Sequence, residues 1–115
     1  MVGQEVEKEL VEKVYEAIEI SKKTGKIRKG SNEVTKALEK GTAKLVAIAS
    51  DITPPEVVMH LPVLSKEKEV PCIQVGSKVE LGAAAGLPIG TSAIAIVDEG
   101  EAKKTVKEIL ADLSK

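Results

Sequence analysis

The chain has 115 residues, a formal net charge of −1 and a hydrophobic fraction of 43% that is almost entirely aliphatic, so we expect one domain over residues 1–115 with an ordinary packed core. One cysteine and one histidine exclude an internal disulfide and the usual zinc sites, and we expect neither a metal nor a cofactor. Because no apolar run reaches the roughly 18–20 residues of a membrane span and the N-terminus is acidic, we expect a soluble cytoplasmic protein with no membrane contact.

The first part of the chain is predicted to contain two helices and a strand. Residues 5–24 carry apolar side chains at helical spacing, and Gly25 can end that helix. Residues 30–32 form a turn with capping residues, and the short helix that follows it ends at Gly41. Residues 43–50 form an aliphatic run that indicates a buried strand. The inward-facing residues of the two helices are predicted to be Val6, Leu10, Val14, Ile18, Val34, Ala37 and Leu38.

The middle of the chain is predicted to add a helix and a second strand. Asp51 follows the first strand, where an α/β enzyme can place a carboxylate, but it is more simply a loop residue before a helix cap. Residues 53–56 form a capping box with proline at the first helical position. We expect the helix to break at Pro62 and to continue to Lys68, and residues 70–75 to form a short strand.

The last part of the chain continues this alternation. A capping box opens a helix over residues 77–86, a loop follows at residues 87–91, and residues 93–98 are the clearest strand of the sequence. A final helix fills residues 101–113 and is predicted to turn Ala102, Val106, Ile109, Leu110 and Leu113 inward. Because strands alternate with helices, the predicted fold class is α/β, a three-layer α/β/α sandwich around a small mixed sheet.

Other features of the sequence have a catalytic and a structural interpretation. The glycines of residues 25–31 have P-loop spacing, but the lysine after the second glycine is missing and the segment follows a helix. The glycines spaced by four in residues 82–90 are no dinucleotide fingerprint and indicate a helix that packs closely on the sheet. His60 is expected to be a satisfied or surface histidine, and Cys72 a small core residue. No active site is predicted, and a small α/β enzyme that uses Asp51 stays as an alternative.

Positive charge is concentrated in one window of the chain. Residues 22–44 carry eight bases and two acids, a net charge of +6, although the whole chain has a net charge of −1. The only arginine and the only asparagine of the chain, Arg28 and Asn32, lie in this window. Charge alone fits a nucleic-acid-binding surface and a solvated face equally well.

The helix that begins near Gly30 and Ser31 gives this window a candidate ligand site. Free backbone amides and the positive end of the helix dipole favour a phosphate there. Lys26, Arg28 and Lys29 lie just before the helix and can add contacts to a nucleic-acid backbone.

Three side chains on the first two turns of the helix, Asn32, Glu33 and Lys36, have the groups that read a guanine edge. Glu accepts from the ring and amino N–H groups, Lys donates to the keto oxygen, and Asn can do either. Glu33 would repel the phosphates that the basic window attracts, so its position is explained if it meets a base. The alternative is that Ser31 or Asn32 caps the helix and Glu33 favours its dipole, and both interpretations can hold at once.

The basic segment reads Lys26-Ile27-Arg28-Lys29-Gly30-Ser31-Asn32-Glu33-Val34-Thr35-Lys36. It resembles the signature of the archaeal kink-turn-binding ribosomal protein family, large-subunit ribosomal protein L-seven-Ae. The likeness covers essentially the whole chain, in order and with the family's spacing. It continues through residues 43–46, Asp51 with Pro55-Glu56, and residues 60–62, 70–71, 76–78, 81–86 and 97–100.

This resemblance implies an α/β/α sandwich that binds kink-turns, which are sharply bent RNA duplexes built on tandem sheared G·A pairs. The guanines of these pairs would be read by Asn32, Glu33 and Lys36. The flanking phosphates would be held by Lys26, Arg28, Lys29 and the amides of Gly30 and Ser31. The loop Leu87-Pro88-Ile89 matches the family's apolar loop and would cover the flipped-out nucleotides, with aliphatic packing in place of aromatic stacking.

The resemblance also implies the RNA partners, which are rRNA, box C/D and H/ACA guide RNAs, and the ribonuclease P RNA that serves tRNA processing. The protein would be a non-catalytic structural clamp and assembly platform of archaeal ribonucleoproteins. It would be monomeric when free and would meet the core proteins of the guide particles. The alternatives are a paralogue confined to one ribonucleoprotein, the small α/β enzyme, and a protein-interaction module that uses residues 87–89.

Overall fold

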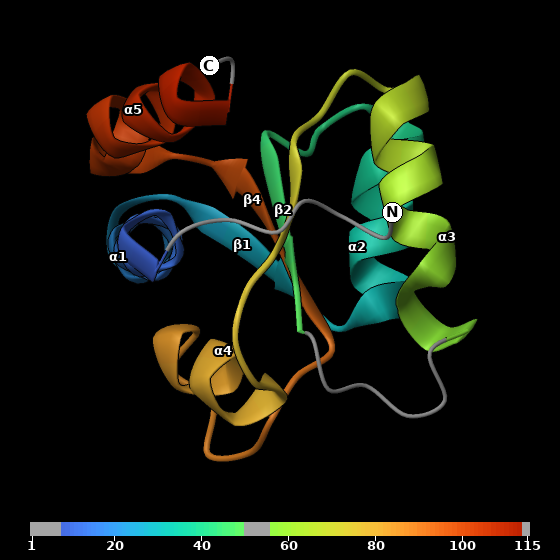
Figure 1. The fold of residues 1–115 in the computed structure, drawn as a ribbon, viewed down its shortest axis with the longest axis horizontal. Coiled ribbons are helices and arrows are strands. Elements are labelled where there is room, and N and C mark those ends of the chain that lie inside the picture. The colour runs from blue at the N-terminus through green and yellow to red at the C-terminus, as the bar shows by residue number, and fades with distance from the viewer. Residues whose placement is uncertain (1–7, 50–55, 114–115) are drawn as a thin grey trace.

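The middle layer of the protein is a four-stranded mixed sheet within residues 8–49 and 56–113, the part of the chain that the computed structural model describes (Figure 1). Strand β4 runs antiparallel to both of its neighbours, β1 and β2, whereas β2 and β3 are parallel. The strands lie in the order β1 (Lys26–Lys29), β4 (Ala93–Asp98), β2 (Leu45–Ile48) and β3 (Cys72–Gln74).

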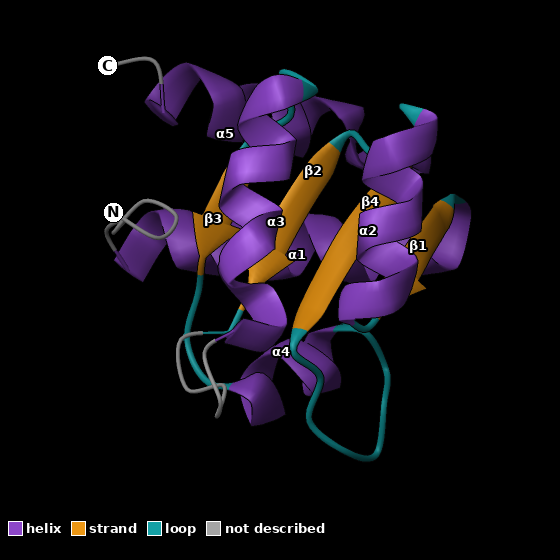
Figure 2. Cartoon of the chain, turned by 90° about the vertical axis from the view of Figure 1, so that its right-hand side faces the viewer, coloured by secondary structure: helices purple, strands orange, loops and turns teal. Residues whose placement is uncertain are grey.

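Helices cover both faces of this sheet (Figures 1 and 2). One face carries α1 (Lys8–Thr24), α4 (Lys78–Ala84) and α5 (Lys103–Leu113), which follows the short 3-10 helix η1 (Gly100–Ala102). The other face carries α2 (Ser31–Lys40) and α3 (Glu56–Glu67). The predicted three-layer α/β/α sandwich around a small mixed sheet is therefore confirmed. None of the helices in the described ranges is both long and apolar enough to cross a membrane.

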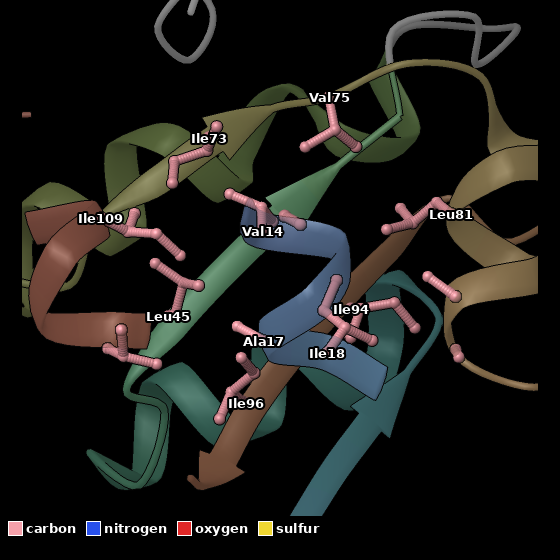
Figure 3. Packing of buried hydrophobic residues seen from close by; sticks show 14 of the residues in the cluster. Val14, Ala17, Ile18, Leu45, Ile73, Val75, Leu81, Ile94, Ile96 and Ile109 are labelled. Atoms are coloured by element: carbon pink, nitrogen blue, oxygen red, sulfur yellow. The ribbon is translucent and has the colours of Figure 1, made fainter. Parts of the chain in front are cut away.

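The alternation of side chains along β4 explains why helices cover both faces. Ile94 and Ile96 are buried in the cluster under α1, α4 and α5, as Figure 3 shows, whereas Ala93 and Ala95 are buried under α2 and α3. Successive residues of a strand point to opposite faces of its sheet. Each large aliphatic side chain that is fully buried in this way stabilises the fold by about 1.5–3 kcal/mol.

Helix α2, which carries four of the predicted site residues, has the end and the buried face that the sequence predicts, but it begins at Ser31, inside the predicted turn at residues 30–32. Val34, Ala37 and Leu38 are buried. The chain leaves the helix at Gly41, whose φ of 74° lies in the left-handed region that glycine adopts without strain. The strand predicted at residues 93–98 is likewise found with these limits.

Strand β1 is not predicted from the sequence. Its four residues pair with β4, although Ile27 is half-buried and the other three side chains, all basic, are exposed. An edge strand of this kind has no alternation of buried and polar side chains to reveal it, because its pairing is made by the backbone.

Helix α3 runs through Pro62 without the predicted break. Proline removes one backbone hydrogen bond from the helix, but Leu61 and Ser65, on either side of it, are both buried and hold the two halves in place. In α5, Val106 and Ile109 are buried as predicted, whereas Leu110 is 39% exposed, so the prediction that it faces the core is wrong.

Several predictions fall outside the described residues. Val6, Asp51 and the first three residues of the capping box at 53–56 belong to segments that are not described, and the same holds for the side chain of Leu113. The second capping box is found in part: the Glu80 amide donates to Ser77 Oγ over 3.2 Å.

Candidate nucleic-acid interface

One edge of the sheet brings together the two segments that are predicted to bind RNA. Lys29, the last residue of β1, faces Ile94 near the start of β4, and the Gly30 amide donates to the Ala93 carbonyl over 2.8 Å. The start of α2 therefore lies beside the loop at residues 87–92, although the two segments are far apart in the sequence. Figure 2 shows this loop next to the lower end of α2, where the helix begins.

The N-terminus of α2 has no side-chain cap from the described residues. Its N-cap residue, Gly30, has φ 90° and ψ 151°, a conformation that residues with a Cβ rarely adopt. The Val34 amide donates to the Gly30 carbonyl over 3.0 Å, so the amides of Ser31, Asn32 and Glu33 precede the first helical hydrogen bond. The alternative in which Ser31 or Asn32 caps the helix is therefore wrong, because both residues lie inside its first turn. Such uncapped amides, with the helix dipole, favour an anion.

The side chains predicted to read guanine, Asn32, Glu33 and Lys36, are all exposed. The Nζ of Lys36 lies 3.8 Å from Oε1 of Glu33, and the two side chains are 65% and 52% exposed. An exposed ion pair contributes at most about 1 kcal/mol. Each of the two side chains can therefore leave the other and contact a ligand instead, at little cost in free energy.

The three bases of β1 occupy different places relative to this helix start. Arg28 pairs with Ala95 and Lys29 with Ile94, so they lie on opposite faces of the strand directly before α2. Lys26 is at the other end of β1, and its Cα is about 10 Å from that of Lys29 in an extended strand. All three side chains are exposed. Arg28 and Lys29 are thus brought to the start of α2, and Lys26 is not.

The loop Leu87-Pro88-Ile89 is divided between the core and the surface. Leu87 packs against the cluster under α1, whereas Pro88 is exposed and Ile89 is 72% exposed. Gly82 of α4 lies so close to the Ile89 carbonyl oxygen that a Cβ at this position would overlap it. The expectation that these glycines fit a helix onto the sheet is therefore wrong for Gly82, which fits α4 onto the loop.

Two further features of this edge are not predicted from the sequence. Val79, in the first turn of α4, is 63% exposed, and the same turn holds the loop because the Thr91 amide donates to the Lys78 carbonyl over 3.0 Å. Val79 could have been found from the sequence, because it is an apolar residue outside the buried stripe of its helix. The second feature is a contact between Thr35 of α2 and His60 of α3, which no local pattern connects.

Cys72 belongs to the core at the start of β3, as predicted. It is half-buried against the cluster under α2 and α3. Burial raises the pKa of its thiol to about 11, and the neighbouring Ser65 hydroxyl opposes this shift in part. The thiol is therefore protonated at neutral pH. Among the described residues, no three histidine, cysteine, aspartate or glutamate side chains gather as metal ligands would.

The chain is similar to known proteins in sequence and in fold. Residues 12–106 match the model of the ribosomal protein L7Ae/L30e/S12e/Gadd45 family. The structure is similar to that of the Giardia lamblia 15.5kD RNA binding protein, with a TM-score of 0.89 and 31% sequence identity, and the match covers 95% of this chain and 91% of that chain. The family match includes α2, the loop at residues 87–92 and the whole sheet between them. The chain belongs to the ribosomal protein L7Ae/L30e/S12e/Gadd45 family.

Proposed function

We propose that this protein is a single RNA-binding domain that recognises kink-turns and acts as a structural clamp and assembly platform. One observation carries the proposal: the uncapped start of α2, with Asn32, Glu33 and Lys36 exposed on it, lies beside the partly exposed loop 87–89. Membership of a family of ribosomal proteins and the similarity to an RNA binding protein of Giardia lamblia support it.

The phosphate contacts are assigned to the backbone and to the adjacent bases. The amides of Ser31 to Glu33 lie at the positive end of the α2 dipole and would face a phosphate. The expectation that the Gly30 amide also holds a phosphate is wrong, because this amide already donates to the Ala93 carbonyl. Arg28 and Lys29, directly before them, would contact the neighbouring phosphates on either side of the strand. Lys26 would reach only the outer part of the RNA, because it lies at the far end of β1.

The base contacts are assigned to the first two turns of α2. Glu33 would accept from the N–H groups of a guanine, Lys36 would donate to a keto oxygen, and Asn32 could do either. The ion pair between Glu33 and Lys36 keeps both groups near each other in the free protein. Two adjacent sheared G·A pairs would present two guanines to the first two turns of α2.

The exposed part of the loop is assigned to the unstacked nucleotides of the kink. Pro88 and Ile89 offer an aliphatic surface, and Val79 of the neighbouring α4 turn extends it. RNA is read mainly at unstacked bases, which usually stack on aromatic side chains. This chain has no Phe and no Trp, so aliphatic contacts take that place.

The RNAs proposed for this site are rRNA, box C/D and H/ACA guide RNAs and ribonuclease P RNA. The protein would hold the bent form of each RNA and present it to other components, including core proteins of the guide particles. It would itself take part in no chemical step, also within the ribonuclease P of tRNA processing. We place this activity in the cytoplasm of an archaeal cell.

A gel-shift titration tests the proposal. One RNA contains a kink-turn, and the control is the same duplex with its G·A pairs replaced by Watson–Crick pairs. We expect the kink-turn to bind at least about tenfold more tightly, because two base contacts are lost in the control. Both RNAs are compared at one salt concentration, since phosphate contacts depend on salt. Equal affinity for the two RNAs would contradict kink-turn recognition.

A further inference from the structure

We infer that His60 is a positioning residue for the start of α2 and that it acts through the hydroxyl of Thr35. Thr35 Oγ1 donates to the Ser31 carbonyl oxygen over 2.7 Å and lies 2.7 Å from Nε2 of His60. Ser31 is the first residue of α2, and His60 belongs to α3, which lies beside α2 on the same face of the sheet (Figure 2). The consequence for RNA binding rests on the proposed function.

The two contacts of the hydroxyl fix the direction of both hydrogen bonds. A hydroxyl has one hydrogen and can also accept. Because Thr35 Oγ1 donates its hydrogen to Ser31, it must accept from His60, and Nε2 of the imidazole must carry a proton. If Nε2 lacked that proton, the Thr35 hydroxyl would turn towards the ring and the Ser31 carbonyl would lose a donor. A second proton on Nδ1 leaves the arrangement unchanged.

This link acts on a helix start that has no side-chain cap, and it fixes a carbonyl of the first turn while leaving the first-turn amides free. A helix start is usually fixed by an N-cap side chain, but Gly30 has none. Here the first turn is held from inside the helix by Thr35, and Thr35 is held from α3 by His60. The neighbour of His60, Leu61, is fully buried, so α3 is itself anchored against the core. The contacts from α3 thus orient the peptide unit that joins the Ser31 carbonyl to the Asn32 amide.

The peptide unit so oriented carries the Asn32 amide, one of the free amides at the start of α2 that are proposed to bind a phosphate. The amides of Ser31 to Glu33 bind a phosphate well only if they already point in one direction in the free protein, because ordering them on binding would cost affinity. His60 is exposed and could instead touch the RNA directly. The two roles differ in one respect: a direct contact of His60 would not depend on Thr35.

A double-mutant cycle separates these roles. Thr35→Val and His60→Met remove the hydroxyl and the ring donor while keeping similar size, and Thr35→Ser and His60→Gln keep a hydroxyl and an N–H donor. We expect each of the first two variants to raise the Kd for a kink-turn RNA about three- to tenfold, as the loss of one hydrogen bond predicts. The double variant should lose no more than the larger single effect. The two conservative variants should stay within about twofold of the parent.

Two outcomes of this cycle overturn the inference. One is a His60→Met protein with the Kd of the parent. The other is a double variant whose loss equals the product of the two single losses, which would mean that His60 contacts the RNA on its own. Urea unfolding of each variant under the binding conditions verifies that the compared proteins are folded.

A measurement on the free protein decides the inference independently of any RNA. We expect the backbone ¹⁵N order parameters of Ser31 to Glu33 to fall in His60→Met and to recover in His60→Gln, while those of Ala37 and Leu38 stay unchanged. Unchanged order parameters at Ser31 to Glu33 would overturn the positioning role. A parent protein that binds kink-turn and control RNA equally would instead overturn the proposed function, and the order parameters would still decide what His60 does.

Discussion

Lys36 and Glu33 form an exposed ion pair on α2, with Nζ 3.8 Å from Oε1. Both groups are proposed to meet the G·A pairs, one as a donor and the other as an acceptor. In the free protein each offsets the charge of the other, so this turn is less attractive to an arbitrary phosphate than its lysine alone would be. The ion pair therefore favours contacts with RNA bases over contacts with the RNA phosphate backbone at the centre of the basic window, residues 22–44.

Replacement of Glu33 by alanine should remove selectivity between the two RNAs. We expect the affinity for the kink-turn to fall about tenfold or more, since a base contact contributes about 1–3 kcal/mol of discrimination. Affinity for the Watson–Crick control should stay equal or rise slightly, because one negative charge is removed. Glu39→Ala is the matched control, an exposed acid at the other end of the same helix. A Glu33→Ala protein that discriminates as well as the parent would disprove base readout by this carboxylate.

Replacement of Lys29 by alanine should weaken both RNAs alike. A phosphate contact carries no sequence information, and its loss lowers the slope of log K against log salt by about 0.7–0.9. Titrations at several salt concentrations measure this slope. Lys40→Ala, at the far end of α2, is the control and should leave the slope unchanged. A Lys29→Ala effect confined to the kink-turn RNA would show that this lysine reads a base.

Replacement of Gly30 by alanine should weaken RNA binding by more than the loss of folding stability can explain. Gly30 and Gly41 flank the same helix and have φ of 90° and 74°. Apart from their chain neighbours, no atom of the described residues lies within 4 Å of a Cβ added at either position. From backbone strain we expect Gly41→Ala, in the left-handed helical region, to lower the free energy of unfolding by about 1 kcal/mol. Gly30→Ala should lower it by about 1–3 kcal/mol, because ψ of 151° places Gly30 in a region that residues with a Cβ rarely adopt. In binding assays only Gly30→Ala should raise the Kd for the kink-turn. Equal Kd values for the two variants would argue against a role for the α2 N-terminus.

The Cys72 thiol should make the protein less stable above pH 9. Burial raises its pKa from 9.0 to about 11, so between these values the unfolded chain releases a proton that the folded protein keeps. The free energy of unfolding is therefore unaffected by this group below pH 9 and falls as the pH rises towards 11. At pH 10 the loss should be about 1 kcal/mol. Urea unfolding at pH 7 and pH 10 should show this extra loss of unfolding free energy in the parent and not in Cys72→Val. Equal losses in the two proteins would contradict the raised pKa of Cys72 as its cause.

Features that depend on residues close in sequence could be predicted. The buried face of α2 follows from the spacing of Val34, Ala37 and Leu38, and its end follows from Gly41. The strand at residues 93–98 follows from an uninterrupted aliphatic run. These patterns are local, so the sequence contains them whole.

Features that depend on residues far apart could not be predicted. Strand β1 exists through its backbone pairing with β4, and its three basic side chains give no strand signal. The close approach of Gly82 to Ile89 reflects how α4 meets the loop, not how it meets the sheet. In the candidate site the residue identities come from the motif. The missing cap could not be predicted, because it depends on α2 beginning at Ser31, which makes Gly30, a residue without a side chain, the N-cap.

The central claim is that the start of α2 and the loop beside it form one surface for the kink-turn. The most direct test is an amide NMR titration of ¹⁵N-labelled protein with the kink-turn RNA and with its Watson–Crick control. We predict large shifts at Ser31, Asn32, Glu33 and Ile89 with the kink-turn, much smaller ones with the control, and none at Lys103 and Lys107 of α5. Shifts that are the same for both RNAs, or that are largest on α5, would contradict the claim.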